Sequence, residues 1–103
     1  MIAARDHIGI RPIYYKKDAE ELMFASEAKA ILALSRVERR ISNQYLAGVH
    51  VGTIPVDVCA FDGIKCLKPA HLLVIEDTKV LPPTPYWNLS FTPDFTMSRY
   101  DAR

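Results

Sequence analysis

The stretch RDHIGIRPIYY, residues 5–15, leads from one short apolar segment through a turn into a second one. The apolar run at residues 2–4 breaks at a polar cluster that ends in Gly9, a pattern typical of turns. The Arg-Pro step that follows favours an extended backbone, and the branched and aromatic side chains of residues 13–15 suit a pleated strand. The stretch therefore predicts a strand, a turn and a second strand.

A hairpin and two short helices are expected next. Residues 22–25 are predicted to form a third strand, separated from the second by a charged connection. Ser26 can cap a helix over residues 27–34, since its hydroxyl can accept a hydrogen bond from the first helical turn. A second helix should begin after Ser42 and end at Gly48.

The last strands are expected before a polar tail. Residues 71–75 predict a strand, and a turn at Asp77 and Thr78 leads to a hairpin partner at residues 79–81. The three prolines at positions 82, 83 and 85 lack the N–H that a central strand donates, so they argue against regular pairing there. The sequence thus predicts an α+β fold of antiparallel strands with two short helices.

Length and charge restrict the classes of function. With 103 residues the chain has room for one small domain, expected at residues 1–91, followed by a linker at residues 92–103. Its 13 Lys and Arg against 12 Asp and Glu give a formal net charge of +1, too little basic excess to predict nucleic acid as a partner. No apolar run reaches the roughly 18 residues that cross a bilayer, and charge follows the first residues too soon for a signal peptide. We therefore expect a soluble, cytoplasmic protein without a membrane partner.

The cysteines and histidines predict no metal or redox site. Six residues separate Cys59 from Cys66, which matches neither a zinc-binding spacing nor a redox pair, so both are expected to be reduced core thiols. His7, His50 and His71 have no acidic or cysteine neighbour at ligand spacing and are expected to be structural or surface residues.

Three segments together resemble a known family. Residues 5–15 resemble the strand-turn-strand of class II glutamine amidotransferases, and FASEAKAIL at residues 24–32 is similar to the form found in glutamine-hydrolysing asparagine synthetases. FDGI at residues 61–64 is similar to the end of the same domain, together with Leu67, Pro69, His71, Tyr86 and Trp87. The resemblance implies the C-terminal half of an amidotransferase domain, with partial layers of the N-terminal-nucleophile-hydrolase fold. The family usually has glycine where this chain has Ala70, which matters if the backbone there needs a positive φ.

The resemblance also implies which chemistry these residues lack. In the family an N-terminal cysteine attacks glutamine with help from its own amino group, whereas residues 1 and 2 here are Met and Ile. The glutamine-binding segments of the family precede the region matched here, and the Ser-Gly-Gly-x-Asp-Ser loop that binds ATP is absent from the sequence. We therefore assign no catalytic, cofactor-binding or metal-binding residue; glutamine, ATP and Mg are expected only in the intact parent enzyme.

Several side chains invite a catalytic role that the sequence does not favour. Arg5 and Asp6 are expected to form a structural ion pair with other segments, or to contact a synthetase domain. Cys59 and Cys66 show no neighbouring cation in the sequence that would activate a thiolate. The aromatic residues are expected to pack in the core and between layers rather than to form a binding platform; these are Tyr14, Tyr15, Tyr86 and Trp87.

Two functional hypotheses remain open from the sequence, and a third, a metal or redox protein built on the two cysteines, is kept only as a control. In the first, the chain is a truncated glutaminase domain of an asparagine synthetase that is inactive alone. In the second, it is a non-catalytic binding or structural module that associates with itself or with a missing half-domain. Removing upstream strands would leave sheet edges with unpaired backbone groups, so a homodimer or higher oligomer is expected.

Overall fold

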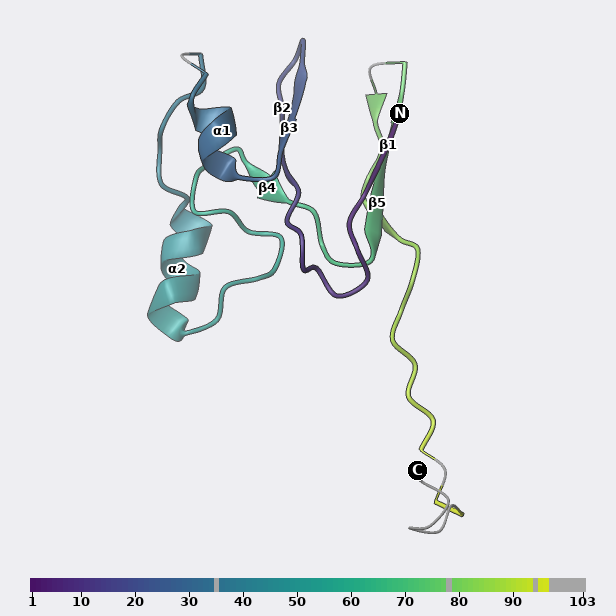
Figure 1. Ribbon diagram of the computed structural model, residues 1–103. Coiled ribbons are helices and arrows are strands. Elements are labelled where there is room, and N and C mark those ends of the chain that lie inside the picture. The colour runs from purple at the N-terminus through teal and green to yellow at the C-terminus, as the bar shows by residue number, and fades with distance from the viewer. Residues whose placement is uncertain (35, 78, 94, 97–103) are drawn as a thin grey trace.

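Two antiparallel sheets and two helices make up the computed structural model, which describes residues 1–34, 36–77, 79–93 and 95–96 (Figure 1). One sheet has the order β1-β5-β6, with β7 also paired to β5, and the other has the order β3-β2-β4. The predicted α+β class is confirmed. The elements are β1 (Ile2–Ala4), β2 (Tyr14–Lys17), β3 (Leu22–Ala25), α1 (Ala28–Leu32), α2 (Asn43–Val51), β4 (Lys65–Cys66), β5 (His71–Glu76), β6 (Lys79–Val80) and β7 (Thr84–Pro85).

The first sheet is built around β5. β1 pairs with it in antiparallel register, with Ala3 opposite Leu73. β6 and β7 pair along the strand too, and the predicted hairpin between β5 and β6 is confirmed, although Thr78 of its expected turn lies outside the described residues. The expectation that the prolines exclude pairing is wrong for Pro85, which lies opposite His71. A proline is tolerated there because β7 is an edge strand of two residues, so no further strand requires a hydrogen-bond donor at the Pro85 nitrogen.

The second sheet is built around β2. The predicted hairpin is confirmed, since β2 and β3 pair from Tyr14 opposite Ala25 to Lys17 opposite Leu22. The second strand extends two residues further than expected, into the lysines of the charged connection. β4 pairs with the other side of β2 and supplies the last strand of this sheet.

The first helix is shorter than expected and is capped differently. α1 begins after Glu27 rather than Ser26, and no side chain makes a cap hydrogen bond. Its buried residues Ile31 and Leu32 nevertheless form the expected apolar stripe, which packs on β2 and β3. Together with Met23 they belong to the buried core under this sheet.

The second helix begins as predicted but ends later. The Ser42 side chain accepts a hydrogen bond from the Tyr45 N–H at 3.3 Å, which confirms the cap. The predicted end at Gly48 is wrong, because the helix continues to Val51 and ends at Gly52 with φ 74°. Gly48 instead allows close packing: a Cβ added there would lie 2.9 Å from the Thr53 carbonyl oxygen.

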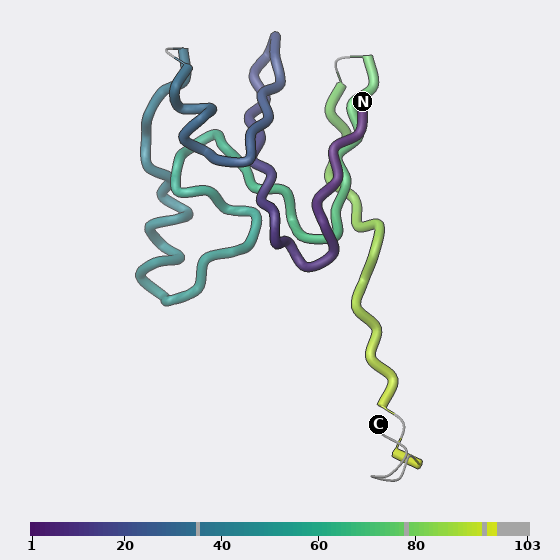
Figure 2. The backbone as a smooth tube through the Cα atoms, viewed as in Figure 1, coloured from purple at the N-terminus to yellow at the C-terminus, as the bar shows by residue number. Residues whose placement is uncertain are grey.

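The two sheets do not pack face to face along their whole length. The two sheets lie apart in the upper part of the ribbon and are joined by the segments before β2 and after β4, while the C-terminal segment leaves the body as an extended strand of chain (Figures 1 and 2). α2 contacts no other helix or strand among the described residues. Residues 94 and 97–103 of the expected linker lie outside the described residues, so the boundary at residue 91 stays a prediction. No helix in the described part of the chain is long and apolar enough to cross a bilayer.

Candidate functional site

A clamp centred on Arg5 holds together the segments that join the two sheets. Its guanidinium donates hydrogen bonds to the Leu67 carbonyl at 2.6 Å, the Gly9 carbonyl at 2.9 Å and the Arg11 carbonyl at 3.1 Å. The same side chain lies 3.5 Å from the Cys66 sulfur. One guanidinium therefore fixes the loop after β1 against the end of β4.

Asp6 organises the turn from the other side. Its two carboxylate oxygens accept hydrogen bonds from the Ile10 N–H at 2.8 Å and the Arg11 N–H at 3.0 Å. Its main-chain carbonyl accepts from the N–H groups of Gly9 and Ala70. The backbone N–H groups of Arg11 and Ile10 favour the ionised carboxylate, so they hold the pKa of Asp6 below its ordinary value.

The prediction that Arg5 and Asp6 form ion pairs with other segments is wrong. Neither side chain pairs with an opposite charge in the described part of the chain; both bind backbone groups instead. The partners differ from the predicted ones because the turn presents carbonyl and N–H groups that have no ladder partner. The predicted alternative, a contact with a synthetase domain, stays a prediction. A sequence pattern does not show which backbone groups a turn will leave free.

Ala70 occupies the position at which the family usually has glycine. Its φ is 57°, so the backbone at Ala70 adopts the left-handed conformation. The sequence alone left open whether a positive φ is needed at this position. A non-glycine residue in this region costs about 1 kcal/mol. Hydrogen bonds hold the conformation from both sides, because the Ala70 N–H donates to Asp6 and the Ala70 carbonyl accepts from Tyr86.

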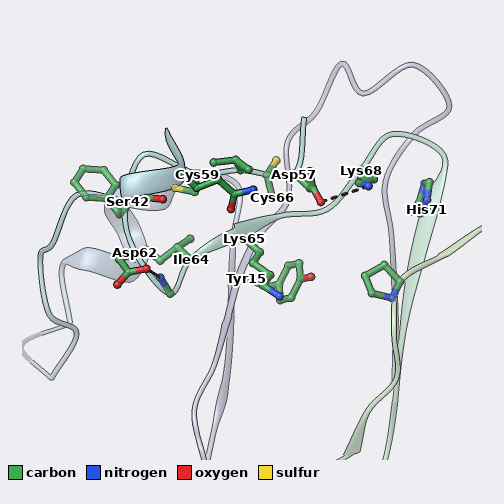
Figure 3. Close-up of a pocket in the computed structure, with 15 residues that line it drawn as sticks. Tyr15, Ser42, Asp57, Cys59, Asp62, Ile64, Lys65, Cys66, Lys68 and His71 are labelled. Atoms are coloured by element: carbon green, nitrogen blue, oxygen red, sulfur yellow. Dashed lines mark hydrogen bonds and ion pairs between the residues drawn. The ribbon is translucent and has the colours of Figure 1, made fainter. Parts of the chain in front are cut away.

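A cavity of about 390 Å³ lies beside this clamp, along β4 (Figure 3). Its lining includes polar side chains that the sequence did not single out, notably Asp57, Lys65 and Lys68. The Lys68 ammonium lies 3.4 Å from an Asp57 carboxylate oxygen. Tyr15 and His71 face the same space from the two sheets. The cavity was not predictable because its lining residues come from β2, α2, β4, β5 and the loops between them, which are brought together only by the tertiary structure.

Both cysteines are free and buried, as predicted. The sequence showed no cation near them, but the structure places the Arg5 guanidinium beside Cys66. Burial raises the pKa of the Cys66 thiol, and the nearby Arg5 charge only partly opposes this effect. Because a thiol with a raised pKa carries little thiolate at neutral pH, Cys66 is a poor nucleophile.

The aromatic residues divide between core and surface. Tyr14 packs against the buried core, and Tyr15 lies with its ring centroid 6.4 Å from that of Phe24. The packing prediction is wrong for Tyr86 and Trp87, which are 41% and 38% exposed. Both rest on the ring of His7, at centroid distances of 5.5 Å and 4.9 Å, and the Tyr86 hydroxyl donates to the Arg5 carbonyl. These contacts attach the C-terminal segment to the turn.

The three histidines do not meet. His7 lies under the exposed aromatic rings, the His50 ring faces the Leu46 carbonyl of its own helix, and Nδ1 of His71 is 2.8 Å from the Pro69 carbonyl oxygen. Within the described ranges no three His, Cys, Asp or Glu side chains are grouped so that they could hold a metal ion.

Comparison with known proteins shows the family of the chain. A family model described as "Glutamine amidotransferase domain" matches residues 1–87, and the chain belongs to this family. Among curated proteins it is 35% identical over 92 residues to "Asparagine synthetase [glutamine-hydrolyzing] 3" of Bacillus subtilis, and 27% identical over 99 residues to "Putative asparagine synthetase [glutamine-hydrolyzing] 2" of Methanocaldococcus jannaschii. It is also 29% identical over 96 residues to "Amidase chry2" of Gibberella zeae.

These relatives are much longer than the matched region. The match to the Bacillus subtilis protein covers 86% of this chain but only 15% of that relative. The other two matches each cover 92% of this chain. They cover 14% of the Gibberella zeae protein and 19% of the Methanocaldococcus jannaschii protein. The predicted resemblance to glutamine-hydrolysing asparagine synthetases is confirmed. The family assignment implies layers of the N-terminal-nucleophile-hydrolase type, which the two antiparallel sheets fit.

Proposed function

We propose that this chain is the structural half of the glutamine amidotransferase domain of an asparagine-synthetase-type protein. In that larger protein, glutamine hydrolysis would supply ammonia for the ATP- and Mg-dependent amidation of aspartate. The residues described above would build both sheets and clamp them together. They would not perform the attack on glutamine. The names of two relatives, both asparagine synthetases, support aspartate as the amide acceptor.

Open sheet edges carry this proposal. The Ile75 N–H donates to the Met1 carbonyl and the Arg5 N–H donates to the His71 carbonyl, so the backbone groups of Ile2 and Ala4 point away from β5. No described strand pairs with them. The unpaired N–H and C=O groups of such an edge are a template for pairing, so we infer that another strand completes it.

The other sheet has the same property. The Asp18 N–H donates to the Glu21 carbonyl at the hairpin turn, which directs the backbone groups of Leu22 and Phe24 outward. β3 is an edge strand of this sheet. Both sheets can therefore be extended, one at β1 and one at β3, as the remaining strands of a layered amidotransferase domain would require.

We further propose that the 103 residues alone do not hydrolyse glutamine. The family resemblance implies a nucleophilic cysteine with a free amino group, whereas Cys59 and Cys66 are buried in the core. We also propose a cytoplasmic location, because two free thiols suit a reducing compartment.

A chimera tests the structural role. Residues 1–87 replace the matched region of the Bacillus subtilis relative, and glutamine hydrolysis is measured by ammonia release. We expect the chimera to hydrolyse glutamine, because the clamp and both sheets are supplied intact. A chimera that folds with native-like circular dichroism and releases no ammonia would contradict the proposal.

The second candidate function is a self-associating module without catalysis, and the same open edges of β1 and β3 favour it. Light scattering after size exclusion separates the alternatives for the isolated chain. A dimer or higher oligomer supports completion of the edges by a second copy. A compact monomer counts against self-association.

A further inference from the structure

Two neighbouring cavities form one groove between the sheets. The cavity of about 390 Å³ and a second cavity of about 290 Å³ share four lining residues: Tyr15, Gly63, Lys65 and Pro83. One wall of the second cavity comes from β2 and β4, and the opposite wall comes from β5 and residues 80–83. Each volume falls at or near the lower end of the range of small-molecule pockets.

The β2–β4 wall carries two lysines, Lys17 and Lys65. Lys65 lies opposite Tyr15 in the ladder, and Lys17 follows Tyr15 by two residues, so all three side chains emerge on the same face of the sheet. In the described part of the chain neither Lys17 nor Lys65 makes an ion pair or a side-chain hydrogen bond. Each is therefore available to a ligand.

The carboxylates around the groove are already engaged. Asp57 lies 3.4 Å from Lys68, and Asp62 lies 3.3 Å from Arg40. Neither carboxylate is bonded to Lys65. The uncompensated charge in the groove is therefore positive, which favours an anionic ligand.

The opposite wall is apolar. Val80 from β6 and the following Leu81 line the second cavity, and two prolines continue this wall. Leu73 of β5, whose side chain is fully buried, backs it. Water in contact with such a wall is displaced favourably by hydrocarbon. The groove thus presents ammonium groups on one side and an aliphatic surface on the other.

We infer that this groove binds a small organic anion, whose carboxylate or phosphate group contacts Lys17 and Lys65 and whose hydrocarbon lies on Val80 and Leu81. Tyr15 adds a hydroxyl on the same face of the sheet as the two lysines. Burial, and then the nearby Asp57, raise the pKa of Tyr15, so its hydroxyl stays protonated and can donate a hydrogen bond. The inference does not depend on the proposed amidotransferase role, because it uses only the groove.

Pentanoate, pentyl phosphate and 1-pentanol are the probes that test the inference on the full 103-residue chain. Saturable shifts of the Lys17, Gly63 and Lys65 amide signals in nitrogen-15 NMR spectra are expected with pentanoate or pentyl phosphate and not with 1-pentanol. The tighter of the two anions identifies carboxylate or phosphate as the preferred headgroup. Equal shifts with 1-pentanol, or no shifts with either anion, would overturn the inference.

Matched lysine variants test the contact residues. Lys17→Met and Lys65→Met should each weaken anion binding about fivefold, as expected for the loss of one exposed charge contact. Lys79→Met is the control, because this exposed lysine on β6 lines neither cavity. Acetylation followed by mass spectrometry gives a second readout, in which pentanoate should protect Lys17 and Lys65 but not Lys79. Equal effects at all three lysines would refute the site.

Discussion

Replacing Arg5 by methionine removes the clamp between the two sheets while keeping a side chain of similar length. The change leaves three backbone carbonyls, those of Leu67, Gly9 and Arg11, without their guanidinium donors. Hydrogen bonds to a charged group contribute about 1.5–3 kcal/mol each when buried. Because Arg5 is only half-buried, we take about 1 kcal/mol for each bond, and the expected loss of unfolding free energy is about 3 kcal/mol.

Urea denaturation followed by fluorescence measures this loss, since Trp87 is the single tryptophan and rests on the turn beside Arg5. With a slope of about 1.5 kcal/mol per molar urea, the midpoint should fall by roughly 2 M. Arg5→Lys keeps the charge but loses the forked geometry, so it should recover only about a third of the loss. Arg11→Met is the control, because only its backbone joins the turn, and it should cost less than about 0.5 kcal/mol.

Two results would refute the clamp. If Arg5→Lys matched the unsubstituted chain, charge alone would explain the effect and the three directed bonds would not. If Arg5→Met changed the midpoint no more than Arg11→Met, the carbonyl contacts would contribute nothing to stability. Should Arg5→Met be unfolded without urea, a titration with the osmolyte TMAO extends the same curve.

Three further predictions follow from the turn, the second helix and the thiols. The pKa of Asp6 is lower in the folded chain than in the unfolded chain, so its ionised carboxylate should stabilise the fold at pH values above the ordinary aspartate pKa of about 4. This stabilisation should be lost as the pH falls through the folded-state pKa. In Asp6→Asn, the part of the acid-induced fall in urea midpoint that Asp6 causes should disappear. Gly48→Ala should destabilise by about 1–3 kcal/mol, because the new Cβ would lie 2.9 Å from a carbonyl oxygen of the next loop. Gly52→Ala has open space and should lose only about 1 kcal/mol, from its φ of +74°, and thermal unfolding of both variants checks the order. Cys59 and Cys66 should react slowly with a thiol reagent in the folded chain and rapidly in urea; equal rates would show that the thiols are accessible.

The sequence was most informative where side-chain type and local spacing determine the element. The structure confirms three features that depend on neighbours in the chain: the strand at residues 2–4, the hairpin formed by the second and third strands, and the cap at Ser42. The prediction of where the second helix ends was wrong because a glycine such as Gly48 is typical of a helix terminus. In the structure, Gly48 instead allows the helix to pack closely against the next loop. That contact belongs to tertiary structure and leaves no local signal.

The site was less predictable than the fold. The family resemblance directed attention to the turn that begins at Arg5. It also identified Ala70 as a position where a positive φ would matter, and the structure has φ 57° there. It did not show that Arg5 and Asp6 bind backbone groups, nor that Arg5 lies beside Cys66. Lys65 and Tyr15 are 50 positions apart in sequence, and only the pairing of β2 with β4 brings them into one groove.

The most direct test of the central claim is a covalent trap for a nucleophile. The 103-residue chain is incubated with an electrophilic glutamine analogue, ammonia release from glutamine is followed in parallel, and the intact mass is measured. If these residues form the structural half of an amidotransferase domain, the mass stays unchanged and no ammonia appears above the blank. A stoichiometric adduct on Cys59 or Cys66, accompanied by turnover of glutamine, would contradict the account.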